Sequence, residues 1–310
     1  MNLQTLLCGK QVAAKIYENL QLVPQPDEKS QYGLDVILVG ERSDSKLYVS
    51  MKSKKLTEYG IHVNVHHFES DVEEKELIET IKSLNRSRTT LGIMIQLPLP
   101  EHLNTQTICD TIDPKKDVDG LTSFNIGGIV TDTSIFKPCT AEAVMQILDY
   151  YEIPIEGKEV TVLGKSNVIG TPVSLLLSKK NATVTMCDIY TPDAKIFARR
   201  SDIIVTATGK AELINVTWFS KKKCVVIDVG ISIKEIDGKK HIYGDVQKSL
   251  ESTIWRKTPV PGGVGPVTIA VLVSHCLEAY KTIFIEKKER EYASLNIPTE
   301  QLMSSLHQFC

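Results

Sequence analysis

The sequence predicts an α/β fold with parallel sheets in two domains. Short β-branched runs alternate with helix-length amphipathic segments, which is the pattern of βαβ units. This alternation occurs twice, and residues 112–140 between the two series are rich in turn formers and poor in periodicity. With 310 residues and 42% hydrophobic side chains, the chain can fill two cores. A domain junction is therefore expected between the two series.

The first series contains three expected strands, at residues 34–40, 61–68 and 91–96. Amphipathic helices are expected before and between them, from about residue 11 and near residues 45–59 and 72–84. Because a helix separates each strand from the next, the strands are expected to pair in parallel.

The second series contains four expected strands, at residues 159–164, 182–187, 202–208 and 224–230. A last strong helix is expected over about residues 266–285, either closing the second domain or returning to the first. Residues 286–310 are polar and interrupted by Pro298, which indicates an appended tail.

Composition excludes several classes of partner. The 36 basic and 38 acidic side chains leave a net charge of −2, so neither a nucleic acid nor a membrane is an expected partner. No apolar run approaches the roughly 20 residues that span a bilayer, and the N-terminus lacks the pattern of a signal peptide. The seven cysteines form no CxxC pair and the seven histidines no HExxH, so we expect neither disulfides nor a metal site. A cytoplasmic location is expected.

The stretch "GKSNVIGTP" follows the first strand of the second series and opens a helix. Small residues at Gly164, Ser166 and Gly170 let a phosphate approach the backbone at the helix N-terminus. The spacing departs from a Rossmann fingerprint, since the middle glycine is serine and the third comes one residue late. A phosphate-binding P-loop would need glycine at position 159, which is glutamate, and a nucleophile elbow would need it at 168, which is valine. The pattern favours a dinucleotide site over a plain tight turn.

Asp188 ends the next strand, where Rossmann proteins place an acid that binds the adenosine ribose. Aspartate is also common before a loop, so a solvated turn residue is an equal alternative at this position.

Other polar residues suggest a substrate site in the first series. Tyr48 and Lys52 are four residues apart on one expected helical face, and Gln96 ends a buried strand, where an amide needs a partner. Asp119 precedes a glycine, and residues 258–268 are too rich in proline and glycine for a flexible linker. Together these features describe an apolar cleft with a few fixed polar groups.

These motifs resemble the bifunctional methylenetetrahydrofolate dehydrogenase/cyclohydrolase family over roughly residues 5–285. The pattern Y-V-x-x-K-x-K occurs at residues 48–54, QLPLP at 96–100, KDVDG at 116–120 and TPVPGGVGP-x-T at 258–268. PCT at 138–140 and the turn at 164–172 match as well.

The resemblance implies two α/β domains flanking a cleft, usually in a homodimer. Residues 1–138 with 266–285 would form the folate domain, residues 139–265 the Rossmann-like NAD(P)-binding domain, and 286–310 a tail. The last helix would return to the N-terminal domain. The implied chemistry is NAD(P)-dependent oxidation of 5,10-methylenetetrahydrofolate to the 5,10-methenyl form, followed by hydrolysis to 10-formyltetrahydrofolate.

The resemblance also implies roles for single residues. Lys52 would move the proton during hydrolysis with Gln96 as its partner, Tyr48 would pack on the folate, and Asp119 would bind the amino-side edge of the pterin. The further residues expected at the tetrahydrofolate site are Ile95, Leu97, Pro261, Gly262, Gly265 and Thr268, with Thr268 at the start of the closing helix. The residues expected at the NAD(P) site are Thr140, Gly164, Lys165, Ser166, Gly170, Asp188, Ile189, Thr208, Gly209 and Ile231.

The choice between NAD and NADP is where the chain departs from the family. Members that use NADP carry arginine in the G-R-S turn and His-Ser after the second strand, whereas this chain has Lys165 and Asp188-Ile189. Lysine keeps the charge without the bidentate fork, isoleucine lacks the hydroxyl, and aspartate repels a 2′-phosphate. We therefore expect NAD-leaning or relaxed use, although Lys165 would have little reason to remain cationic there if no phosphate ever bound.

Three alternatives remain on the sequence alone. One is a member of the same family with a single activity, and another is a folate-binding protein without catalysis. A different Rossmann oxidoreductase, of the shikimate or amino-acid type, would explain residues 159–230 but not QLPLP, KDVDG or TPVPGGVGP.

Overall fold

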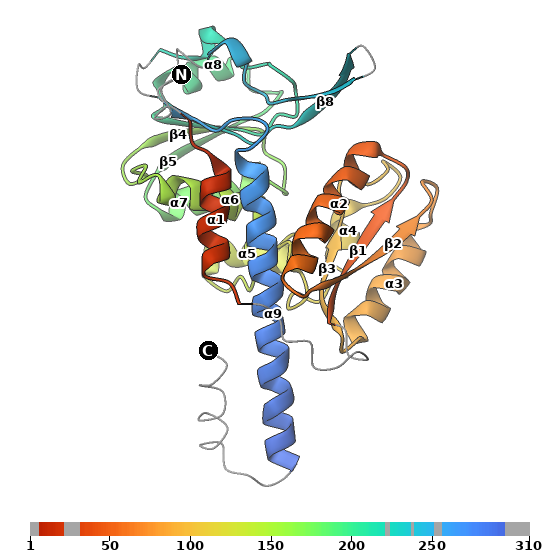
Figure 1. Cartoon of the computed structure of the whole chain (residues 1–310). Helices are drawn as coiled ribbons and strands as arrows, with labels where there is room; N and C mark the ends of the chain where they lie inside the picture. The colour runs from red at the N-terminus through yellow and green to blue at the C-terminus, as the bar shows by residue number, and fades with distance from the viewer. Residues whose placement is uncertain (1–5, 22–31, 221–223, 237–238, 251–255, 295–310) are drawn as a thin grey trace. The chain divides into compact units, whose positions relative to one another are not determined.

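The computed structural model describes residues 6–21, 32–220, 224–236, 239–250 and 256–294 of the 310-residue chain (Figure 1). They fall into two compact units, each assembled from separate stretches of chain. Unit 1 comprises Met1–Leu20, Thr105–Asp110 and Asp119–Leu272, and unit 2 comprises Gln21–Asn104, Thr111–Val118 and Val273–Cys310. The domain boundaries expected from the sequence stay a prediction.

Unit 2 contains a parallel three-stranded sheet in the order β2-β1-β3. Its strands are β1 (Gly33–Val39), β2 (His62–Phe68) and β3 (Thr90–Ile95), and its connecting helices are α2 (Ser43–Glu58) and α3 (Glu74–Arg86). Every residue of β1 and β3 is buried, in keeping with their mainly apolar sequences, whereas β2 is partly exposed at the edge. The strands and helices expected in the first series are confirmed within one or two residues at most ends.

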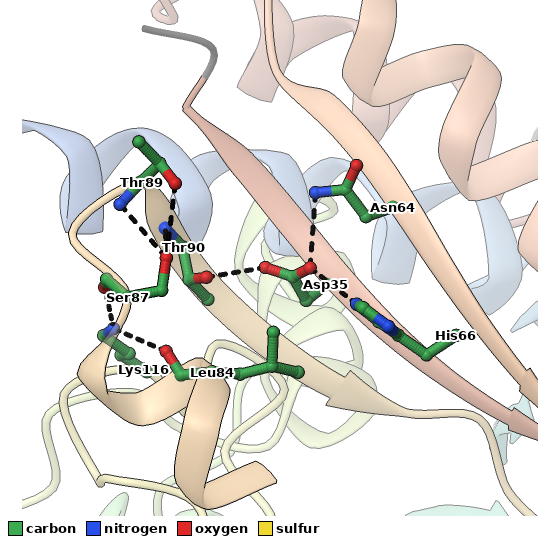
Figure 2. Close-up of polar contacts among 8 residues, drawn as sticks. All are labelled: Asp35, Asn64, His66, Leu84, Ser87, Thr89, Thr90 and Lys116. Atoms are coloured by element: carbon green, nitrogen blue, oxygen red, sulfur yellow. Dashed lines mark hydrogen bonds and ion pairs between the residues drawn. The ribbon is translucent and has the colours of Figure 1, made fainter. Parts of the chain in front are cut away.

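Asp35 is the one charged residue in the buried strand β1, and three side chains compensate it (Figure 2). Its Oδ1 lies 2.8 Å from Nε2 of His66 and accepts a bond from Asn64 at 3.2 Å. Its Oδ2 accepts a bond of 2.8 Å from the hydroxyl of Thr90. These partners, from both neighbouring strands, make burial of the carboxylate tolerable and link the three strands by side chains.

Unit 1 contains a parallel five-stranded sheet in the order β10-β7-β6-β4-β5. The strands are β4 (Glu159–Leu163), β5 (Thr183–Cys187), β6 (Ile203–Thr206), β7 (Val225–Asp228) and β10 (Arg256–Lys257). After β4 the chain first adds β5 on one side and then β6 and β7 on the other. This reversal is the switch point at which doubly wound sheets bind ligands. The predicted α/β class with a Rossmann-like parallel sheet is confirmed.

The helices of unit 1 include α1 (Gly9–Glu18), α4 (Thr105–Cys109), α5 (Ser123–Thr131), α6 (Cys139–Tyr150), α7 (Gly170–Lys179) and α8 (Ala194–Arg200), with short 3₁₀ turns at Val216–Trp218 and Lys248–Leu250. The sequence pattern predicted α1 and α7 but did not indicate α4, α5, α6 or α8. Helix α5 lies within the stretch expected to be irregular. Two glycines weaken its helical pattern, but the hydroxyl of Thr122 accepts the N–H of Asn125 and caps its start.

Two further elements differ from expectation. The antiparallel hairpin of β8 (Ser232–Ile236) and β9 (Lys239–Tyr243) was not foreseen, because the segment lacks the apolar alternation of a half-buried strand. Helix α9 (Val264–Ser294) starts earlier and ends later than the expected helix at 266–285. Its residues through Leu272 belong to unit 1, and those from Val273 belong to unit 2. No helix among the described residues, α9 included, is long and apolar enough to cross a membrane.

Candidate active site

Helix α2 presents Tyr48 and Lys52 one turn apart, as their spacing predicted. The amine of Lys52 is partly buried and lies 3.3 Å from Oε1 of Gln96 and 3.3 Å from the sulfur of Met94. Both neighbours are uncharged acceptors. The structure therefore brings together the lysine and the amide that the sequence placed 44 positions apart.

Gln96 directly follows β3 and is only 8% exposed. Its backbone N–H is bound to the carbonyl of Ile37 at 2.9 Å, and its side-chain NH₂ donates to the carbonyl of Leu97 at 2.9 Å. Since the NH₂ group already has its acceptor, the amide oxygen is the atom that faces Lys52. The partner that a buried amide at a strand end requires is thus identified.

Tyr48 is half-buried in unit 2. Burial raises the pKa of its phenol, and the nearby charge of Asp44 adds to this effect. The phenol therefore stays neutral at physiological pH, with its hydroxyl available as a donor and its ring as an apolar surface.

Lys116 anchors the KDVDG segment to the end of helix α3 (Figure 2). Its amine donates to the carbonyls of Leu84 at 3.0 Å, Asn85 at 2.8 Å and Ser87 at 2.6 Å. These are carbonyls at the C-terminal end of the helix, where a cation is favoured. Burial lowers the pKa of Lys116, while the charges of Asp113 and Asp35 oppose that shift. Sequence reasoning overlooked this lysine, although it stands inside a motif it had singled out.

Asp119 continues the KDVDG segment into unit 1, where its carbonyl accepts the N–H of Cys139 at 3.1 Å. The following Gly120 has a φ of +73°, and a Cβ there would lie 2.5 Å from the carbonyl carbon of Lys137. Only glycine fits this turn, which sets the position of the preceding carboxylate.

The loop at 258–268 is held in unit 1 at its start and in its middle. Thr258 is fully buried, and Gly262 accepts the N–H of Gly9 at 2.9 Å with its carbonyl. A Cβ at Gly265 would meet nothing within 4 Å, so this glycine leaves open space beside the backbone. Thr268 lies in the second turn of α9 rather than at its start, because the helix begins at Val264.

The turn after β4 has the geometry of a phosphate cradle. Gly164 has a φ of +106°, and a Cβ at Gly170 would lie 1.9 Å from the carbonyl oxygen of Gly164. The chain therefore passes closely over itself just before α7, and Ser166 stabilises the crossing by accepting the N–H of Ile169 at 3.2 Å. An exposed Ser166 between two glycines, just before a helix N-terminus, suits an anionic ligand.

Lys165 and Asp188 form an ion pair of 2.7 Å at the ends of β4 and β5. The hydrogen bond from Lys165 holds the pKa of Asp188 below its usual range, and the same bond raises the pKa of Lys165. The other carboxylate oxygen of Asp188 accepts the N–H of Tyr190 at 3.0 Å. Asp188 is therefore both a turn residue and the partner of the cation in the cradle, and the next residue, Ile189, is 76% exposed.

The remaining residues expected at the dinucleotide site also lie in unit 1. Thr208 and Gly209 follow β6 and Ile231 follows β7, so these three come after strand ends, and Thr140 lies in the first turn of α6. Sequence reasoning missed two buried acids behind these loops, Asp228 and Asp245. The signal that could have found Asp228 is a carboxylate closing the apolar strand "VVID".

Comparison with known proteins gives a consistent result over most of the chain. Residues 7–119 match the model of the tetrahydrofolate dehydrogenase/cyclohydrolase catalytic domain, and residues 138–284 match that of its NAD(P)-binding domain. The bifunctional protein FolD of Nautilia profundicola is 41% identical over 289 residues, which cover 92% of this chain and all of that one.

Two crystal structures give the same result in three dimensions. The bifunctional FolD of Campylobacter jejuni is 37% identical with a TM-score of 0.80, covering 90% of this chain and 99% of that one. The FolD of Trypanosoma brucei, complexed with NADP and an inhibitor, is 33% identical with a TM-score of 0.80, covering 88% and 95%. The chain therefore belongs to the tetrahydrofolate dehydrogenase/cyclohydrolase family and carries both of its domains.

Proposed function

We propose that this protein oxidises 5,10-methylenetetrahydrofolate to the 5,10-methenyl form and hydrolyses that product to 10-formyltetrahydrofolate. Family membership supports both activities, since the chain matches both domain models. The observation that carries the hydrolytic activity is the contact of Lys52 with Gln96. Separate assays of methylenetetrahydrofolate oxidation and methenyltetrahydrofolate hydrolysis test the proposal, and absence of either activity in the folded protein would reduce it to a single-activity enzyme.

Hydrolysis requires a proton to move. Water adds to the carbon between N5 and N10 of the methenyl cation and loses one proton to the solvent, which leaves a hydroxyl group on that carbon. The bond from the carbon to N5 then breaks as the hydroxyl loses its proton and N5 gains one, leaving the formyl group on N10. Lys52 is proposed to transfer this proton, held in place by the amide oxygen of Gln96, while the ring of Tyr48 packs on the folate.

Oxidation places different demands on the protein. The dinucleotide, when bound, accepts a hydride from the one-carbon unit, and this transfer needs no acid or base from the chain. The protein contributes orientation and exclusion of water. Asp119 is proposed to bind the pterin edge, and the open backbone beside Gly265 to accommodate the folate. Ile95, Leu97, Pro261, Gly262 and Thr268 remain proposed substrate residues.

The family establishes an NAD(P)-binding domain, and we propose that this chain prefers NAD or uses both dinucleotides. The support is the ion pair of Lys165 with Asp188. The cation in the cradle has a partner without any 2′-phosphate, so its presence no longer argues for NADP. A phosphate at this position would also face the carboxylate of Asp188. Comparing kcat/KM for NAD⁺ and NADP⁺ tests this preference.

A homodimer in the cytoplasm completes the proposal. Strand β5 is the last strand of its sheet, so one edge is open to pairing with a second copy, and Met186 on it is 47% exposed. Light scattering coupled to gel filtration measures the mass directly. A monomer at micromolar concentration would contradict the dimer, and fractionation of cells tests the location.

A further inference from the structure

Two buried aspartates of unit 1 have no place in the chemistry described above. Asp228 ends β7 and is 2% exposed, and Asp245 follows β9 and is fully buried. Each carboxylate lies against a glycine beside the other aspartate. A Cβ at Gly230 would lie 2.0 Å from Oδ1 of Asp245, and a Cβ at Gly244 would lie 2.1 Å from Oδ2 of Asp228. The two segments therefore interlock, and both positions require glycine.

Asp228 binds backbone groups with both of its oxygens. Oδ1 accepts the N–H of Gly230 at 3.2 Å and that of Asp245 at 3.0 Å, and Oδ2 accepts that of Val246 at 3.0 Å. The backbone N–H of Asp228 itself donates to the hydroxyl of Thr258 at 2.7 Å. One residue thus joins the loop after β7, the segment after β9 and the start of the loop at 258–268.

Asp245 uses one oxygen for both of its bonds. Oδ2 accepts the hydroxyl of Thr206 at 2.8 Å and the backbone N–H of Thr208 at 2.6 Å. Oδ1 is buried with no hydrogen-bond partner among the described residues. Because Thr206 ends β6 and Thr208 lies two residues further on in the next loop, Asp245 sets the direction in which the chain leaves β6.

The arrangement is electrostatically unfavourable. Burial, together with the charge of Asp245, raises the pKa of Asp228 to about 7, against hydrogen bonds from Val246 and Asp245 and the charge of Lys257. Neutral groups of similar shape would remove that penalty if packing were the only need. The presence of Asp245 beside Asp228 is therefore better explained by the hydrogen bonds that the two carboxylates make to the loops than by packing.

The loops held by the two aspartates follow β6 and β7, which lie on the same side of β4 in the strand order. Strands β6 and β7 are separated by β4 from β5, whose end carries Asp188 at the position of the adenosine ribose. A dinucleotide extended across the strand ends has its nicotinamide half on the side of β6 and β7. We propose that Asp228 and Asp245 are positioning residues for hydride transfer, which hold the loops after β6 and β7 at the spacing that the nicotinamide half requires. This rests on the proposed dinucleotide contacts of Thr208, Gly209 and Ile231.

The two activities of the enzyme provide an internal control. Asp245→Ala removes the acceptor of Thr208, and we expect kcat/KM for the dinucleotide to fall about tenfold or more, the scale of a small misplacement of reacting groups. Hydrolysis of methenyltetrahydrofolate needs no dinucleotide and depends on Lys52 and Gln96 in unit 2. Its rate per folded protein should stay near the wild-type value. If both activities fall in the same proportion, the pair is only structural and the proposal is overturned.

The hydrogen-bond pattern predicts which conservative variant recovers activity. Asp245→Asn keeps one side-chain oxygen, which is enough for the donors of Thr206 and Thr208, so it should restore most of the lost oxidation. In Asp228→Asn only one side-chain oxygen remains, and the NH₂ group that replaces the other would face a backbone N–H. We therefore expect oxidation to stay low in Asp228→Asn, in contrast to Asp245→Asn. Equal behaviour of the two asparagine variants would contradict the positioning role.

A milder pair of variants covers the case in which the alanine variants fail to fold. Thr206→Val removes one hydroxyl donor to Asp245 and should lower the ratio of oxidation to hydrolysis. Thr161→Val removes a hydroxyl of equal burial from β4 of the same sheet, bonded to Ser201 at 2.6 Å, and should leave that ratio unchanged. Equal ratios in the two variants would overturn the proposal.

One further variant tests the proposed dinucleotide contacts separately from the positioning role of the two aspartates. Ile231→Ala, titrated with reduced dinucleotide by fluorescence, tests the proposed contact itself. Unchanged affinity would remove that contact and with it the basis for the positioning role. Weaker affinity here, with unchanged activity ratios in Asp245→Ala and Thr206→Val, would overturn the positioning role alone.

Discussion

The amine of Lys165 lies 2.7 Å from a carboxylate oxygen of Asp188, so the two residues that bear on dinucleotide choice neutralise each other. The side chain of Lys165 is 60% exposed and that of Asp188 only 15%. Removing the acid therefore frees a flexible cation that can reach a phosphate at the same position.

For Asp188→Ser we expect the ratio of kcat/KM for NADP⁺ to that for NAD⁺ to rise about tenfold, because a repulsive charge is lost and Lys165 is freed. Steady-state kinetics with both dinucleotides measures the ratio, and the effect should weaken at high salt. Asp193→Ser is the control, since serine can still cap the start of α8. An equal rise in the control would show that charge near the site, rather than the ion pair, sets the preference.

Replacing Lys52 by methionine should abolish hydrolysis of methenyltetrahydrofolate and leave some oxidation of methylenetetrahydrofolate. The variant keeps an unbranched side chain but cannot move a proton. Lys46→Met, also on α2 and paired with the exposed Glu41, should retain both activities. Hydrolysis by the Lys52 variant at the wild-type rate would refute the assignment.

Asp119→Ala should weaken tetrahydrofolate binding and lower both activities, since both reactions need the same bound pterin. Binding of the folate, measured by calorimetry, should weaken by roughly 1.5–3 kcal/mol for a lost bond to a charged group. Dinucleotide affinity serves as the control and should not change. A folate affinity equal to that of the wild type would remove Asp119 from the substrate site.

Lys116→Met should destabilise the protein by about 1–3 kcal/mol, because partly buried carbonyls at the end of α3 lose their donor. Urea unfolding, followed by circular dichroism, measures the change in the free energy of unfolding. The control is Lys82→Met, an exposed position on the same helix. If the two variants were equally stable, the three short contacts of Lys116 would contribute nothing measurable.

The pKa of Asp228 predicts a pH dependence of stability. Its folded value of about 7 is above the ordinary value of 3.8, so the folded state holds the proton more tightly than the unfolded state. The resulting stability is fully present below about pH 4 and is lost as the pH rises through 7, by at most about 1.4 kcal/mol for each unit. The free energy of unfolding of the wild type, relative to that of Asp228→Asn, should therefore fall between pH 5 and pH 8. A constant difference would mean that Asp228 is already ionised at pH 5.

Much of the fold followed from local pattern. The strands β1, β3 and β4 are short and mainly apolar, and α2 and α3 have helical periodicity between turn formers. The elements that escaped prediction are those whose stability does not reside in such a pattern. Helix α5 contains two glycines and depends on its cap at Thr122, and strand β10 has only two residues, paired with β7.

The candidate site likewise has features that follow from local sequence and others that depend on tertiary contacts. Spacing alone placed Tyr48 and Lys52 on one helical face, and the cost of burying an amide implied a partner for Gln96. Local chemistry could not identify that partner as Lys52, which only the family resemblance implied, because 44 residues separate the two and the packing of α2 beside the sheet joins them. Asp245 was invisible for a similar reason, since it is an unremarkable acid until β6 and β7 lie beside it.

The sequence by itself determined the α/β class, the positions of most strands along the chain, the family and the residue types available for proton transfer and dinucleotide binding. These features depend on short-range periodicity and on contiguous motifs, which can be identified from neighbouring residues in the sequence. Only the tertiary structure decided which charges neutralise each other, as Lys165 does Asp188, and which buried acids hold which loops. Such pairings depend on distances between segments remote in the chain, and those distances exist only after the sheets have formed.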